Sequence, residues 1–250
     1  MITCRTLSEN EICRDLFRHF IRHQVVTDCW RRDNGKWVIR PDPFIDEWTE
    51  EDYGALIEDL RETVRSFGFV YAAFCDGQLK GFISVTSELF GTSQQYLDLT
   101  NLHVSEDQRR WGIGKALFAA ANKWAKEHGA GKLYISAHSS VESQAFYRNL
   151  GCVEAKEYNQ AHVEKEPFDC QLECVLKITT ESLGVSQIMK KTAFILFTAI
   201  IMLVASRFAV RIIDATVQID DDVFLLLVFL AAMNLAIGFL SYKIYKMISK

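Results

Sequence analysis

A strand, a turn with two glycines and a helix follow one another over residues 102–118, and this stretch constrains the fold most. The strand pattern ends at Val104, Gly112 and Gly114 lie in the turn, and an apolar helical pattern follows. The first turn of a helix has backbone N–H groups without internal partners, and glycines let a phosphate approach them without a Cβ in the way. We therefore expect an anion site here. Three cationic side chains accompany it: Arg109, Arg110 and Lys115.

The spacing of this turn argues against two other phosphate-binding folds. There is no Gly-Lys-Ser/Thr at Walker spacing, which argues against a P-loop NTPase. There is no Gly-x-Gly-x-x-Gly, which argues against a dinucleotide-binding fold. Taken alone, the two glycines are also consistent with a tight strand-to-helix turn that binds nothing. The net charge of -4 argues against a general nucleic-acid binder.

The first 180 residues alternate between strand and helix patterns, which predicts a mixed α/β domain. Asn34-Gly35 and Asp76-Gly77 are typical hairpin turns. Ser8 with Glu11, and Thr49 with Asp52, have the spacing of capping boxes. The expected strands are 2–6, 25–26, 37–39, 69–75, 80–87, 96–104, 133–137 and 170–178, and the expected helices are 8–20, 49–67, 112–128 and 140–150.

The pattern Arg109-x-x-Gly112-Ile113-Gly114, placed five residues after Val104, resembles the acetyl-CoA signature of the GNAT superfamily of N-acetyltransferases. The stretch 143–152 resembles the helix and strand start that follow the fifth strand in that family. The resemblance covers residues 1 to about 178 and implies a mixed, mostly antiparallel central sheet with flanking helices. Trp111 and Glu106 depart from the residues usual in the family, and neither removes an amide that the site needs.

The resemblance also implies how acetyl-CoA, as co-substrate, would be held. Backbone groups of residues 102–104 would pair with the pantetheine arm as an added strand does, and amides of residues 109–115 would hold the pyrophosphate. No metal is implied. The cofactor-binding residues expected on this basis are Leu102, His103, Val104, Arg109, Arg110, Trp111, Gly112, Ile113, Gly114, Lys115, Ser139, Ser140 and Ser143.

Two residues are the expected catalytic groups. Tyr147 aligns with the tyrosine that often protonates the leaving thiolate in the family, and a core aromatic beside Phe146 is the less favoured alternative. Asp98 is the candidate base, and strand alternation places it on the same face as Val104 and opposite His103. It lies roughly 13 Å along the strand from the expected acetyl position, so it would act through water or be only a structural carboxylate.

Substrate recognition is expected in the N-terminal region, where aromatic side chains surround the predicted hairpin. Their rings suit a small amine. An acidic run at residues 42–52 would either attract a cation or be the solvated start of a helix, where acidic residues are favoured. A satellite core under a long insertion is the alternative. The expected substrate-binding residues are Trp30, Trp37 and Trp48.

These features predict an acetyl-CoA-dependent N-acetyltransferase that acts on a primary amine of a small molecule or peptide by direct transfer in a ternary complex. A catalytically silent acyl-CoA-sensing module, coupled to a membrane hairpin, is the alternative. Seven scattered cysteines, with no export signal, are expected to be reduced thiols in the cytosol.

Two apolar runs, residues 192–206 and 223–242, predict a two-helix transmembrane hairpin. Lysines flank the pair and aspartates fill the link, which favours a cytoplasmic catalytic domain. The expected organisation is a catalytic domain at 1–180, a linker at 181–189 and the membrane hairpin at 190–250. Ala232 and Ala236 give a small-residue face that suits the first span or a second copy, so a homodimer is one expected arrangement. Buried core helices, or a fused membrane protein starting at Met189, remain alternatives.

Overall fold

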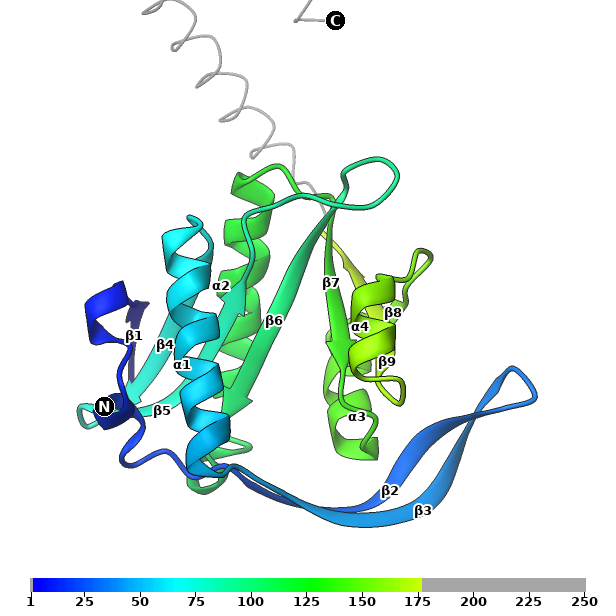
Figure 1. Cartoon of the computed structure of the whole chain (residues 1–250), viewed down its shortest axis with the longest axis horizontal. Helices are drawn as coiled ribbons and strands as arrows, with labels where there is room; N and C mark the ends of the chain where they lie inside the picture. The colour runs from blue at the N-terminus through cyan, green and yellow to red at the C-terminus, as the bar shows by residue number, and fades with distance from the viewer. Residues whose placement is uncertain (1, 177–250) are drawn as a thin grey trace, which may run out of the picture. The chain divides into compact units, whose positions relative to one another are not determined.

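The computed structural model describes residues 2–176, which belong to the first of two compact units, Met1–Ile178. Within these residues a seven-stranded sheet has the order β1-β4-β5-β6-β7-β9-β8, and β2 and β3 form a separate hairpin (Figure 1). The strands are β1 (Ile2–Thr6), β2 (His23–Asp33), β3 (Lys36–Glu47), β4 (Phe69–Cys75), β5 (Gln78–Val85), β6 (Tyr96–Val104), β7 (Lys132–Ala137), β8 (Val153–Glu154) and β9 (Cys170–Val175). The α-helices are α1 (Glu50–Arg65), α2 (Ile113–Glu127), α3 (Val141–Asn149) and α4 (Gln160–Lys165).

The prediction of a mostly antiparallel sheet is confirmed, and β6 and β7 are its parallel pair. These two strands pair over three positions, Tyr96 with Lys132, Leu97 with Leu133 and Asp98 with Tyr134. Beyond Asp98 the ladder between them ends, and Figure 1 shows the strands diverging. The sheet therefore has an opening in its interior, next to the strand end that the sequence marks as a binding site.

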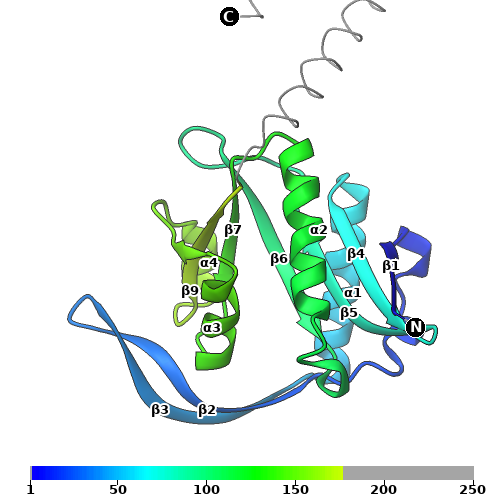
Figure 2. The same ribbon diagram turned by 180° about the vertical axis from the view of Figure 1, so that it is seen from behind.

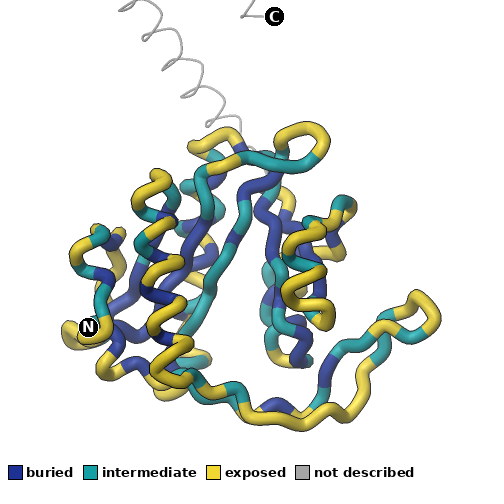
Figure 3. The backbone as a smooth tube through the Cα atoms, viewed as in Figure 1, coloured by how far each residue is buried: buried dark blue, intermediate teal, exposed yellow. Residues whose placement is uncertain are grey.

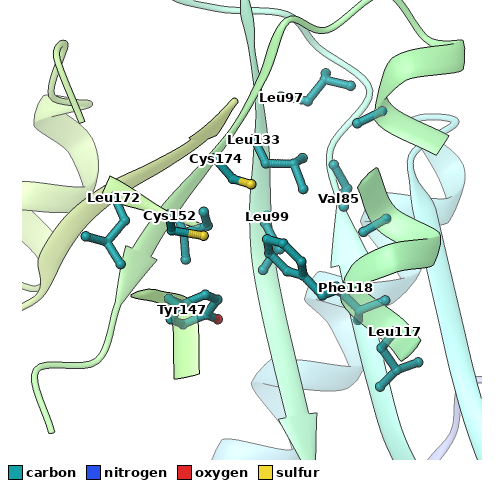
Figure 4. Close-up of a cluster of buried hydrophobic side chains, with 14 of the residues drawn as sticks. Val85, Leu97, Leu99, Leu117, Phe118, Leu133, Tyr147, Cys152, Leu172 and Cys174 are labelled. Atoms are coloured by element: carbon teal, nitrogen blue, oxygen red, sulfur yellow. The ribbon is translucent and has the colours of Figure 1, made fainter. Parts of the chain in front are cut away.

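Helices cover both faces of the sheet. Figures 1 and 2 show α1 and α4 on one face and α2 and α3 on the other. Leu97, Leu99 and Leu133 pack toward α2 in the larger core (Figure 4), whereas Phe82 packs toward α1 in a second core. The sheet interior is buried, whereas much of the β2–β3 hairpin is exposed (Figure 3). The two faces can therefore present different groups to the opening between β6 and β7.

A β-bulge in β6 corrects the alternation expected for this strand. Ser84 pairs with Asn101 and Val85 pairs with Leu99, so Thr100 is an extra residue. One extra residue moves every later side chain to the other face. His103 therefore shares the face of Asp98 and packs on Phe82, while Val104 lies on the opposite face. The expected placement of Asp98 with Val104, and opposite His103, was wrong.

The N-terminal segment also differs from the expectation. The capping box of Ser8 and Glu11 is present, but two short 3-10 turns, Glu9–Glu11 and Arg14–Phe17, replace the helix expected at 8–20. Ile12 and Phe17 are nevertheless buried against the α1 core. The Ile12 carbonyl accepts a hydrogen bond from Arg61 Nε at 2.9 Å, so a tertiary contact replaces a bond within a helix. By contrast, the Thr49 capping box opens α1 as predicted.

Two elements have no sequence signal long enough to reveal them. β8 has two residues and α4 has six, which is less than two helical turns. In residues 2–176 no helix is both long and apolar enough to cross a bilayer. The two spans expected at 192–206 and 223–242, with their linker, lie outside the described residues.

Candidate active site

A cavity of about 1500 Å³ occupies the opening between β6 and β7. Residues 99–104 of β6 line one side, and Ile135 and Ser136 of β7 line the other. The glycine turn before α2 lies at its edge, and α3 and α4 contribute further side chains. The cavity thus joins the predicted phosphate turn to both faces of the sheet.

The turn before α2 has the backbone geometry that an anion site needs. Arg110 and Gly112 have φ of 69° and 81°, which turns the chain sharply before the helix. Gly112 is the N-cap, and Ala116 N donates to its carbonyl at 3.0 Å. The amides before Ala116 are therefore left for another acceptor. A Cβ built on Gly112 meets no atom within 4 Å in the described chain, so the space beside this backbone is open.

Gly114 has a different structural reason to lack a side chain. A Cβ there would lie 3.2 Å from Phe146 Cε2 and 3.5 Å from Val104 Cγ2. The missing side chain lets α2 approach α3 across the end of β6. Gly114 therefore determines the packing of the helix whose N-terminus forms the site.

Cationic side chains surround the cavity beside this turn. Arg109, Arg110 and Lys115 line it, as does Arg22 from the segment before β2. Arg22 forms an ion pair with Asp46, and its Nε is buried without a hydrogen-bond partner in the described chain. Burial, with Arg22 and Arg109 nearby, lowers the pKa of His103 to about 3. His103 is therefore neutral at pH 7, and the positive charge at this end of the cavity comes from the arginines and Lys115.

Tyr147 lies at the cavity on the face covered by α2 and α3. Its ring packs edge-on against Phe118, 6.2 Å between centroids, among the buried side chains of Figure 4. Burial raises the pKa of its phenol above the ordinary value. Its side chain lines the cavity. It is therefore a protonated donor available to a bound group.

Asp98 does not itself line the cavity, but it is hydrogen-bonded to His162, which does. Asp98 Oδ2 lies 2.6 Å from His162 Nε2. His162, on α4, does line the cavity and stacks on the Tyr134 ring. Sequence reasoning missed His162, because α4 is short and 64 residues separate the two partners.

The three serines expected at the cofactor divide into two groups. Ser143 lines the cavity, whereas Ser139 and Ser140 are buried away from it. Ser139 Oγ accepts a hydrogen bond from Arg31 Nη1 at 2.6 Å, and its carbonyl accepts from Trp30 N at 2.8 Å. Ser140 Oγ accepts from Ser143 N and caps α3. Ser139 and Ser140 therefore stabilise the start of α3 and the attached hairpin, and they do not form part of the cavity wall.

The three tryptophans divide in the same way. Trp48 lines the cavity, with His103 4.6 Å from its ring centroid. Trp30 and Trp37, expected at the substrate, do not line the cavity. They attach the hairpin to the body of the domain instead. Arg148 of α3 lies over the Trp30 ring at 4.2 Å, and Trp37 Nε1 donates to Glu154 at 3.1 Å. Trp111, expected at the cofactor, is 74 % exposed and outside the cavity lining.

The β2–β3 hairpin crosses the open end of the cavity. Near its base, Ile21 N donates to Ser105 Oγ and Glu106 N donates to the Ile21 carbonyl, just beyond β6. Further along, Trp30 N donates to the Ser139 carbonyl, just beyond β7. Figures 1 and 2 show the hairpin passing below the diverging ends of both strands. It therefore ties together the two strands whose separation makes the cavity.

Comparison with known proteins agrees with this fold. Residues 33–152 match the model of the acetyltransferase (GNAT) family. The structure of nourseothricin acetyltransferase is similar with a TM-score of 0.54 and 16% identity, over 70% of this chain and 99% of that one. A streptothricin acetyltransferase from Bacillus anthracis str. Ames, in complex with acetyl coenzyme A, is similar with a TM-score of 0.52 and 17% identity, over 72% and 99%. A search of curated protein sequences gave no significant match.

Proposed function

We propose that this chain, whose residues 33–152 match the acetyltransferase (GNAT) family model, transfers the acetyl group of acetyl-CoA to a primary amine of a small molecule or peptide. The observation that carries the proposal is the cavity, which joins an anion-binding turn, an opening in the sheet and a buried phenol. A long co-substrate with a diphosphate at one end and a thioester at the other fits this order of groups.

The residues present fit such a co-substrate. Free amides between Trp111 and Lys115 face open space at Gly112, which suits the pyrophosphate. β7 no longer pairs with β6 at residues 99–104. The backbone groups on that side of β6 can therefore pair with the amides of the pantetheine arm. Acetyl-CoA supplies an activated acyl group, and this chain would position it and stabilise the charge that develops.

Direct transfer in a ternary complex is the mechanism that we propose. Placing the amine and the thioester together in one cavity supplies most of the rate enhancement, because it removes the entropy cost of their encounter. Tyr147, with its raised phenol pKa, remains protonated and can donate to the leaving sulfur. Its position on the α2 and α3 face leaves the other face for the acceptor.

The acceptor side of the cavity favours a cation. Trp48 and Phe168 supply aromatic walls. Several carboxylates line the same space, and their field would attract an ammonium group: Asp46, Asp52, Asp59 and Glu166. The names of the two similar acetyltransferases contain nourseothricin and streptothricin. These two compounds therefore belong in the first panel of acceptors, together with simple amines and peptides.

Two measurements on the full chain test this function. Isothermal titration with acetyl-CoA measures binding, and release of free thiol over the amine panel measures transfer. We expect both signals, with thiol release dependent on one class of amine. Binding without thiol release from any amine would support the silent acyl-CoA sensor, and absence of binding would exclude both functions.

We also propose that residues 190–242 attach this domain to the cytoplasmic side of a cell membrane as two spans. The support is the sequence alone: two long uncharged runs, flanking lysines and an acidic link. The full chain should fractionate with membranes, and a thiol introduced by Asp220→Cys should react only from the outer side. Recovery in the soluble fraction would contradict the spans, and labelling from the inner side would contradict the orientation. Crosslinking in the membrane would show whether a second copy packs against them.

A further inference from the structure

On the basis of the acetyl transfer proposed above, we propose that His162 accepts the proton of the acceptor amine and that Asp98 is the residue that positions its ring. His162 Nε2 lies 2.6 Å from Asp98 Oδ2, and this hydrogen-bonded pair lies where β6 and β7 begin to part. His162 lies outside the residues that match the family model.

Three contacts fix the His162 ring. Asp98 holds Nε2, and the Tyr134 ring stacks on it with 5.8 Å between centroids and 27° between planes. Tyr134 also holds the start of α4, because Asn159 N donates to its hydroxyl at 2.9 Å. Asn159 in turn caps α4 by accepting from Ala161 N. The imidazole is thus oriented from the strand, from the ring beneath it and through its own helix.

This orientation leaves one ring nitrogen for chemistry. With Nε2–H donating to Asp98, the neutral ring has its lone pair on Nδ1, and the hydrogen bond found for this ring among residues 2–176 is the one at Nε2. The side chain is 24% exposed and lines the cavity. Nδ1 is therefore the atom that can receive a proton from a molecule in the cavity.

Asp98 stabilises the charge that this proton would bring. Its Oδ1 is buried without a partner in the described chain, so its bond to His162 is its main compensation for burial. The hydrogen bond to Asp98 raises the pKa of His162; burial opposes this effect, Glu166 adds to it and Lys165 reduces it. Two further titratable groups face the ring, Tyr134 beneath it and Asp169 beyond α4. A base whose protonated form is stabilised in this way accepts a proton more readily.

The acid and the base then lie on opposite faces of the sheet. Tyr147 packs in the core with α2 and α3, whereas Asp98 shares the face of Tyr96, on which α4 lies (Figure 2). A thioester in the opening between the strands would have the phenol on one side and the imidazole on the other. His103, the histidine of β6, also lines the cavity, but its low pKa leaves it a weak base.

The step balances as follows. The lone pair of the neutral amine forms the N–C bond to the acetyl carbonyl, and the proton that nitrogen must lose passes to His162 Nδ1. The C–S bond breaks with its electron pair on sulfur, and the thiolate takes a proton from Tyr147. Solvent then removes the proton from His162 and restores that of Tyr147, giving the acetylated amine and free CoA.

The test compares pH profiles of kcat/KM for the best acceptor of the panel. His162→Gln should lower kcat by roughly 100-fold or more and remove the acid limb, with acetyl-CoA affinity unchanged. Asp98→Asn keeps the shape of the side chain and removes its charge, so it should move the acid limb to lower pH. His128→Gln, the same substitution at the end of α2, should leave the profile of the wild type. Added imidazole should restore part of the turnover of His162→Ala.

The outcomes separate this inference from the function on which it rests. No thiol release by the wild type with any amine would overturn both. Turnover of His162→Gln within threefold of the wild type, or an unmoved acid limb in Asp98→Asn, would overturn the base alone. Loss of the acid limb in Asp169→Asn but not in His162→Gln would assign the base to Asp169 instead.

Discussion

The guanidinium of Arg148 lies 4.2 Å from the centroid of the Trp30 ring, and this contact holds the β2–β3 hairpin against α3. The neighbouring backbone bond, Trp30 N to the Ser139 carbonyl, ties the same residue to the end of β7. Trp30 therefore controls how closely the hairpin approaches the open end of the cavity, although it does not line it.

Trp30→Ala should loosen the hairpin and raise the KM for the acceptor, with acetyl-CoA affinity little changed. We expect a loss of about 1–3 kcal/mol in stability, because a ring and its cation–π contact are removed from a partly buried position. Ile39→Ala is the matched control, since Ile39 is the cross-strand partner of Trp30 and is 51% exposed. Hydrogen exchange of hairpin amides and acceptor kinetics measure both effects. Equal changes in the two variants would contradict the anchoring role.

Gly112→Ala should weaken acetyl-CoA binding roughly tenfold or more, because a methyl group and a strained φ would disturb the amides of the turn. Gly129→Ala is the control at the other end of α2. Both glycines have positive φ, 81° and 87°, and open space beside the Cα. Both variants should lose about 1–2 kcal/mol of stability from backbone strain, yet calorimetry should show weaker binding only for Gly112→Ala. Unchanged binding would remove the phosphate site from this turn.

Tyr147→Phe should lower kcat by roughly 10²-fold or more while acetyl-CoA binding stays the same, because the ring remains and the proton donor is lost. The raised pKa of this buried phenol adds a second expectation. Ionisation of Tyr147 should cause no alkaline fall in wild-type turnover up to about pH 10. Pre-steady-state thiol release and titration calorimetry measure the two quantities. Full turnover in the variant would show that Tyr147 is not the general acid and serves only in packing.

His103 predicts how stability depends on pH. Its folded pKa is about 3 and its ordinary value is 6.5, so between these values the unfolded chain binds more protons than the folded one. Stability should therefore fall with decreasing pH in this window, by up to about 1.4 kcal/mol per pH unit from this group. His103→Gln should make that slope shallower in urea titrations at several pH values. An identical slope in the variant would show that other groups cause the acid sensitivity.

Local sequence patterns predicted the fold and one half of the candidate site. The glycine turn, the strand before it and the Thr49 cap are encoded by residues close together in the chain, so their spacing reveals them. The bulge at Thr100 carries no glycine or proline to mark it, and it reversed the expected face of His103. The Asp98–His162 pair depends on tertiary contacts across the sheet, which a pattern of spacing does not contain.

The early end of the β6–β7 ladder also bears on self-association. An unpaired strand edge is a template for another chain, and most proteins carry such edges at the border of a sheet. Here the edge lies inside the sheet, and the β2–β3 hairpin crosses its open end. A slender flexible arm can still enter from the face of the sheet, whereas a second polypeptide strand approaching lengthwise meets the hairpin. The hairpin thus leaves this aggregation-prone edge accessible to small molecules but not to another strand. Its removal should favour oligomers formed by strand exchange.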